Sequence, residues 1–114
     1  MKKMFVLVTA AVMAGGLSLA YGANIDKGKA LFESQVFGGG TTGKSCSTCH
    51  AGGESLGSDL FERSQFTIMG MSKKSLADVI NICIEKPLGG VAIDPDGGEM
   101  QDLIAYMKTL ILKP

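Results

Sequence analysis

The sequence predicts an all-α fold for a single small domain. Apolar residues recur at helical spacing in three segments, and no segment alternates apolar and polar residues as a half-buried strand would. Stretches rich in Gly, Asp and Pro separate these segments. The length of 114 residues and the lack of an internal repeat leave no room for a second domain.

The N-terminal stretch, residues 1–23, has the pattern of a secretory signal peptide. Lys2 and Lys3 precede an apolar run over residues 5–14, which is too short to favour a membrane span. Small residues permit cleavage after residue 20, 22 or 23, namely Ser18, Ala20, Gly22 and Ala23. We therefore expect export to the periplasm, no stable membrane insertion after cleavage, and a mature domain over residues 24–114.

The mature chain begins with a predicted helix that Asp26 caps and that continues to Val36. Phe37 and the glycines at 38–40 end it, and a loop then leads to Cys46. A second glycine-containing loop follows residue 50. The segment 59–69 is ambiguous, with one helical turn expected within residues 60–65.

Two further helices are expected in the second half. The first begins at Ser72 and ends before Pro87, and one face of it carries Leu76, Val79, Ile80 and Cys83. The second begins near Gly98 after a loop over residues 88–98. One side of this last helix carries Met100, Leu103, Ile104 and Met107.

The composition predicts a thin hydrophobic core and excludes some partners. The chain has no Trp, few aromatic residues and 16 glycines, and chains of this size often depend on a metal, a disulfide or a cofactor. Removing Lys2 and Lys3 from the 11 basic residues leaves nine against 11 acidic ones, so the mature chain is mildly acidic. Without a basic stripe or an aromatic platform, we expect no nucleic-acid binding.

The segment Cys46-Ser47-Thr48-Cys49-His50 is the pattern that carries chemistry. Two thiols three positions apart can form thioethers with the two vinyl groups of one porphyrin, and the adjacent His50 is then placed to ligate the iron. A thioredoxin-like redox pair would need a βαβ context, and a zinc site would need a second pair of ligands. His50 is the only histidine in the chain. The pattern therefore predicts one covalent haem c.

Around this motif the mature chain resembles class I c-type cytochromes. Gly28-Lys29-Ala30-Leu31-Phe32 is similar to the first helix of that family, and Asp102-Leu103-Ile104-Ala105-Tyr106-Met107 is similar to its last helix. The resemblance implies a cytochrome c fold of three to five helices wrapped around one haem. It also implies electron transfer with redox-partner proteins in transient encounters.

The second axial ligand of the iron is left open. Family members carry a Met shortly before the last helix, where this chain reads Leu88-Gly89-Gly90-Val91-Ala92-Ile93. Met107 is expected to be a core residue. The candidates are Met100, at the start of the last helix, Met69 or Met71, in the ambiguous segment, and Cys83. An open iron position is a further alternative.

The region around Cys83 is similar to the distal half of sulfur-oxidation and thiosulfate-dehydrogenase cytochromes. The residues that carry this similarity are Ile80-Asn81-Ile82-Cys83, Pro87-Leu88-Gly89-Gly90 and Glu99-Met100. In some of those domains a cysteine on a comparable helix ligates the iron. A thiolate ligand lowers the reduction potential and a thioether raises it. The other interpretation of Cys83 is a small buried thiol.

Residues 38–45 match the phosphate-binding loop pattern G-x-x-x-x-G-K-[ST]. That pattern works between a buried strand and a helix, where backbone amides surround phosphate. A helix is expected before it here and the Cys46 motif follows at once, so we expect no nucleotide binding.

Together these observations predict a periplasmic electron-transfer protein and not an enzyme, because no acid–base pair or open substrate site is evident. One alternative is the haem subunit of a sulfur-compound oxidoreductase with Cys83 at the iron. The other alternative is a gas-binding haem protein.

Overall fold

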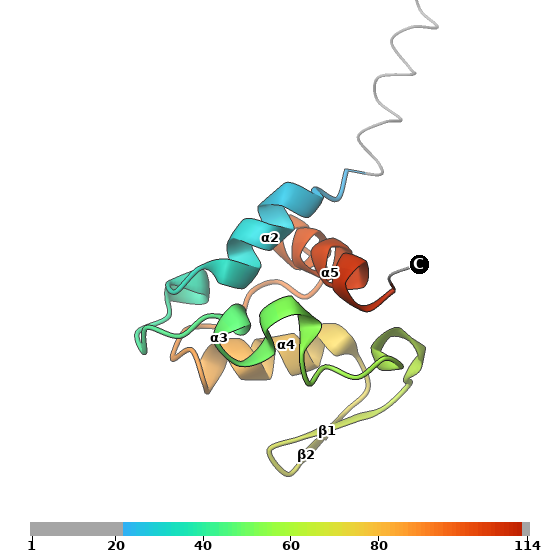
Figure 1. Ribbon diagram of the computed structural model, residues 1–114. Helices are drawn as coiled ribbons and strands as arrows, with labels where there is room; N and C mark the ends of the chain where they lie inside the picture. The colour runs from blue at the N-terminus through green and yellow to red at the C-terminus, as the bar shows by residue number, and fades with distance from the viewer. Residues whose placement is uncertain (1–21, 113–114) are drawn as a thin grey trace, which may run out of the picture.

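The computed structural model describes residues 22–112, so most of the predicted signal peptide lies outside the described residues. The described chain is mostly helical, with one two-stranded sheet (Figure 1). Its helices and strands are α2 (Ile25–Glu33), α3 (Cys46–His50), β1 (Phe66–Ile68), β2 (Met71–Lys73), α4 (Leu76–Glu85) and α5 (Gly98–Ile111). Among residues 22–112, no helix has the length and apolar character needed to cross a membrane.

Helix α2 is shorter than the sequence predicts. Asn24, not Asp26, is its N-cap, and its side chain accepts a hydrogen bond of 2.9 Å from the backbone N–H of Lys27. Asp26 instead lies in the first turn, where a carboxylate interacts favourably with the helix dipole. The helix ends at Glu33 and a separate 3-10 turn, Phe37–Gly39, follows it.

Helices α2 and α5 cross in direct contact near Gly28. A Cβ atom on Gly28 would lie 1.9 Å from the carbonyl oxygen of Asp102, so only glycine permits this approach. The rings of Phe32 and Tyr106 pack edge to face beside the crossing, with their centroids 5.4 Å apart. The backbone N–H of Asn24 donates to Asp102 Oδ1 at 2.7 Å. These contacts join the two ends of the domain.

Helix α4 begins at Leu76, later than predicted, because Ser75 caps it by accepting a 3.1 Å hydrogen bond from the backbone N–H of Asp78. It ends at Glu85, before Pro87, as the sequence predicts. The loop after it is held by Asn81. The amide of Asn81 donates to the carbonyl of Ile93 at 2.9 Å and accepts from the N–H of Ile93 at 2.8 Å.

The expectation of a purely helical chain is wrong for residues 66–73, which form an antiparallel hairpin. Phe66 is paired with Lys73, and Ile68 with Met71. The two loop residues, Met69 and Gly70, both have positive φ, as a two-residue type I′ turn requires. The hairpin occupies the region predicted as ambiguous and the first residues assigned to the following helix.

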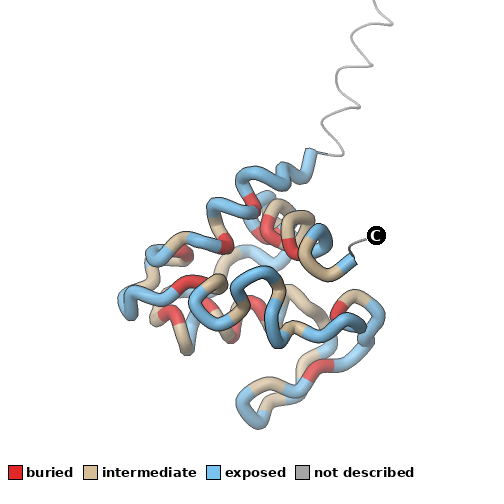
Figure 2. The backbone as a smooth tube through the Cα atoms, in the orientation of Figure 1, coloured by how far each residue is buried: buried red, intermediate tan, exposed pale blue. Residues whose placement is uncertain are grey.

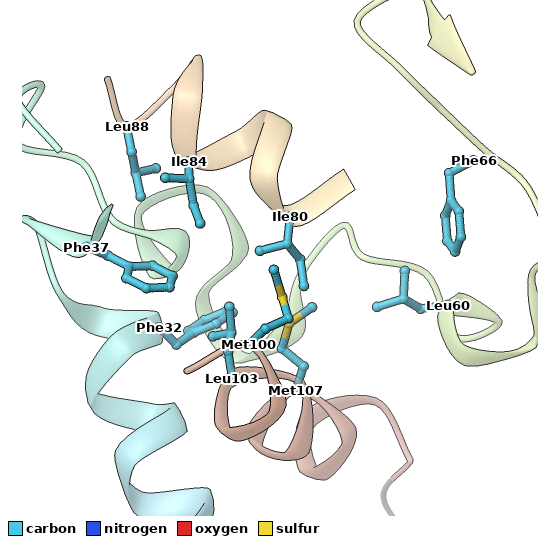
Figure 3. Close-up of a cluster of buried hydrophobic side chains, with 10 residues drawn as sticks. All are labelled: Phe32, Phe37, Leu60, Phe66, Ile80, Ile84, Leu88, Met100, Leu103 and Met107. Atoms are coloured by element: carbon cyan, nitrogen blue, oxygen red, sulfur yellow. The ribbon is translucent and has the colours of Figure 1, made fainter. Parts of the chain in front are cut away.

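The core lies where α2, α4 and α5 face one another, and the buried segments in Figure 2 gather there. Figure 3 shows Ile80, Ile84 and Leu88 along α4 and the turn after it, opposite Met100, Leu103 and Met107 on α5. Leu60 and Phe66 lie farther along, beside the hairpin. The core is therefore supplied mainly by α2, α4 and α5, with Phe66 added from the hairpin that the sequence did not predict.

Candidate haem site

The motif residues lie together on one short helix, α3. Cys46, Cys49 and His50 occupy positions i, i+3 and i+4, which share one face of a helix. Ser45 starts the helix, and its backbone N–H donates to Thr48 Oγ1 at 2.8 Å. Thr48 lies between the two cysteines, so this bond fixes the first turn of α3 and the orientation of both cysteines.

The imidazole of His50 is held by the loop that follows α3. Its Nδ1 lies 2.8 Å from the carbonyl oxygen of Glu54. A carbonyl oxygen only accepts, so Nδ1 carries the proton and donates it. The neutral ring then has its lone pair on Nε2, the form in which histidine ligates a metal, and the bond to the carbonyl fixes the orientation of the ring.

These residues line a mostly apolar cavity of about 220 Å³ between α3, α4, α5 and the hairpin. Cys46, Cys49 and His50 contribute from α3, and the predicted face of α4 contributes all four of its members, namely Leu76, Val79, Ile80 and Cys83. Phe66, Thr67 and Ile68 of β1 line another part of it. The chain thus brings two thiols, one imidazole and a large apolar lining to a single cavity.

Cys83 lines the same cavity from a different helix. Burial raises the pKa of Cys46 to about 11, and the nearby Cys83 contributes to this shift. Burial also raises the pKa of Cys83, with a smaller contribution from Cys49. Both thiols therefore stay protonated at neutral pH unless ligation of a metal displaces the proton.

The four methionines among residues 22–112 lie in different surroundings. Met100 is fully buried, at 0% exposure, within the core and is not among the residues that line the cavity. Met107 is buried and also lines the cavity. Met69, at the hairpin turn, is 55% exposed, and neither it nor Met71 lines the cavity. Of the predicted candidates for the second axial ligand, Cys83 alone lines the cavity.

Sequence reasoning missed three parts of the site. The carbonyl of Glu54 leaves no mark in a sequence, because every residue has one. Arg63 lines the cavity. It is the only arginine in the chain, and this could have marked it as a candidate site residue in the sequence. The hairpin wall also had a signal, since Phe66-Thr67-Ile68 favours a strand and Met69-Gly70 supplies a two-residue loop ending in glycine.

The segment 38–45 does not have the surroundings of a phosphate-binding loop. Its first two residues belong to the 3-10 turn Phe37–Gly39, whereas a phosphate-binding loop would follow a strand. The hydroxyls of Thr41 and Thr42 instead donate to the carbonyls of Gly89 and Pro87, at 3.1 and 2.7 Å. This loop therefore closes against the turn after α4.

Comparison with protein-family models, with curated proteins and with solved structures finds no match to this chain.

Proposed function

We propose that this chain is an exported monohaem c-type cytochrome that transfers electrons between redox proteins. Cys46 and Cys49 would hold the haem through thioethers, and His50 Nε2 would ligate its iron. The observation that carries the proposal is the combination of one shared cavity with the 2.8 Å bond from His50 Nδ1 to the Glu54 carbonyl. That bond leaves Nε2 as the free ring nitrogen.

The lining of the cavity fits a flat apolar cofactor. Phe32, Leu103 and Met107 would contact it from one side of the domain, and Leu76 and Val79 from α4. Bound haem supplies a one-electron couple. The residues of this chain exclude water from it, orient the imidazole and hold the ring covalently, so that little rearrangement accompanies a change of redox state.

We also propose that the domain adopts the cytochrome c fold. The close crossing of α2 and α5 at Gly28, with Phe32 and Tyr106 beside it, supports this assignment. So does the placement of a short helix bearing the Cys46 motif between the two ends of the chain. Docking with redox partners would then involve small and short-lived interfaces.

Cys83 would be the second protein ligand of the iron, because it lines the cavity while Met100 does not. Ligation would deprotonate the thiol despite its raised pKa. This observation also favours a second candidate function, the haem subunit of a sulfur-compound oxidoreductase, over a gas-binding protein.

The test of the main proposal is expression with a signal sequence alongside a cytochrome c maturation system. The mature protein should be coloured and should gain the mass of one haem, which denaturation does not release. The double variant C46A/C49A should carry no covalent haem, and a colourless wild-type chain would overturn the proposal.

The identity of the second ligand follows from the spectrum of the oxidised holoprotein. A thiolate charge-transfer signature that is lost in C83S supports Cys83. A methionine-to-iron band that survives C83S and disappears in M100L would assign the ligand to Met100 instead. A high-spin ferrous form that shifts on addition of carbon monoxide would favour the gas-binding alternative.

A further inference from the structure

The loop that leads into α3 is bound to the turn that follows α4. The backbone N–H groups of Thr41 and Thr42 both donate to the carbonyl of Leu88, at 2.9 and 3.3 Å. The two threonine hydroxyls donate to the carbonyls on either side of it, those of Gly89 and Pro87, at 3.1 and 2.7 Å. Three successive carbonyls of the turn are therefore held by two threonines. We call these four hydrogen bonds the clasp, and Figure 1 shows the loop beside the end of α4.

Glycines bring the two segments close enough for the clasp to form. A Cβ on Gly40 would lie 2.8 Å from the carbonyl oxygen of Leu88. A Cβ on Gly90 would lie 2.6 Å from the carbonyl oxygen of Gly38, which accepts a 2.8 Å hydrogen bond from the N–H of Val91. Glycines of the segment that matches a phosphate-binding pattern therefore allow backbone to pack directly against backbone.

Both ends of the clasp continue to cysteines of the site. On one side, Thr42 Oγ1 accepts a 3.3 Å hydrogen bond from the N–H of Lys44, two residues before Cys46. On the other side, the N–H of Leu88 donates to the carbonyl of Cys83 at 3.2 Å. Cys46 and Cys83 line the same cavity from different helices. A continuous series of hydrogen bonds therefore runs from the helix that carries Cys83 to the segment that ends at Cys46.

The clasp is the polar connection between these two sides of the cavity. Among residues 22–112, no hydrogen bond joins α3 directly to α4. The proposed function requires His50 on α3 and Cys83 on α4 to reach the same iron. Residues that hold the ligands in place affect ligation without contacting the metal. The spacing of α3 and α4 then decides whether Cys83 stays at the iron.

We infer that Thr42, assisted by Thr41, is a positioning residue that holds Cys83 within reach of the iron. This inference rests on the proposed function, with Cys83 as the second ligand. Opening the clasp would free the loop before α3 from the turn after α4, so that Cys83 leaves the iron more often. The loss of one solvent-exposed hydrogen bond changes such an equilibrium by about two- to fivefold.

The test measures how fast added imidazole replaces Cys83 in the oxidised holoprotein, followed by the loss of the thiolate charge-transfer signature. The displaced sulfur takes up a proton from water, and no electron is transferred. T42V removes the bonds to Pro87 and Lys44 and should accelerate the replacement about two- to fivefold. T41V removes the bond to Gly89 and should act in the same direction. T42S keeps the hydroxyl and should behave as the wild type.

The matched control is T109V, which removes another exposed threonine hydroxyl that donates to a backbone carbonyl, that of Tyr106 at 2.6 Å. Thr109 does not line the cavity. T42V and T109V should lower the melting temperature by similar small amounts, but T109V should leave the replacement rate unchanged. Equal rates in T42V and T109V would overturn the inference alone, and so would a C83S spectrum identical to that of the wild type. A colourless wild type would overturn the proposed function instead.

Discussion

Replacing Gly28 with alanine tests the crossing of α2 and α5 on which the domain depends. The added Cβ would lie 1.9 Å from the carbonyl oxygen of Asp102 and 2.8 Å from the Cβ of Tyr106. The nearest atoms belong to the backbone, so no side-chain rotation relieves the overlap and the two helices must separate. Overpacking of this kind costs about 1–3 kcal/mol, and we expect the upper end of that range.

Alanine also has a higher helix propensity than glycine at position 28, which offsets about 0.5–1 kcal/mol of the destabilisation. We therefore expect a net loss of about 2 kcal/mol in the free energy of unfolding. For a domain of this size that loss lowers the melting temperature by about 8–16 °C. Thermal unfolding of the purified protein, followed by far-ultraviolet circular dichroism, measures the change.

The control for this prediction is Gly98, at the first position of α5. A Cβ there would meet nothing within 4 Å, so G98A should be neutral or slightly stabilising. If G28A and G98A melted at the same temperature, the close crossing described above would be refuted.

Substitutions at two positions and two pH-dependent measurements test the packing of the domain. N81A removes both hydrogen bonds to the backbone of Ile93 and should cost about 1–3 kcal/mol in denaturant unfolding. N81D keeps the acceptor for the Ile93 N–H but sets a carboxylate oxygen against the Ile93 carbonyl, so it should cost at least as much. F32A empties a buried site beside Tyr106 and should cost about 3–5 kcal/mol, with partial recovery in F32L; equal stability of F32A and wild type would contradict the packing. In the haem-free chain, the rate of Cys46 alkylation should keep rising with pH and level off only near pH 11, because only the thiolate reacts and burial raises the pKa of Cys46 to about 11. Mass spectrometry after timed quenching measures this rate, and a rate that levels off near 9.0 would show that the thiol is not buried. The same raised pKa makes the folded haem-free chain lose stability as the pH rises from 9 toward 11, where the unfolded thiol ionises first.

The sequence was sufficient to predict the features for which a local residue pattern permits only one structure. The apolar periodicity of residues 76–83 predicts the face of α4 that lines the cavity. The end of α4 before Pro87 and the start of α5 at Gly98 follow from the same local rules. Each of these features is decided by residues close together in the chain.

The features that the sequence did not predict depend on competition or on distant contacts. Asn24 and Asp26 are both good caps, and the hydrogen bond from the Asn24 backbone to Asp102, 78 residues away, favours Asn24. The hairpin contains only three residues in each strand, too few for an alternating pattern to stand out. Phe66 is buried in the core, and this long-range contact stabilises a strand that the local sequence favours only weakly.

The cavity and the core are largely the same set of side chains. Seven of the 11 buried hydrophobic residues also line the cavity: Phe32, Leu60, Phe66, Ile80, Leu88, Leu103 and Met107. A ligand that fills the cavity would therefore complete the packing of α2, α4, α5 and the hairpin at once, and any ligand bound only by the folded chain stabilises that chain. Because the thioethers of the proposed haem are covalent, this stabilisation would not be lost on dilution. The thin core predicted from the composition is thus the expected consequence of building a small domain around a large cofactor.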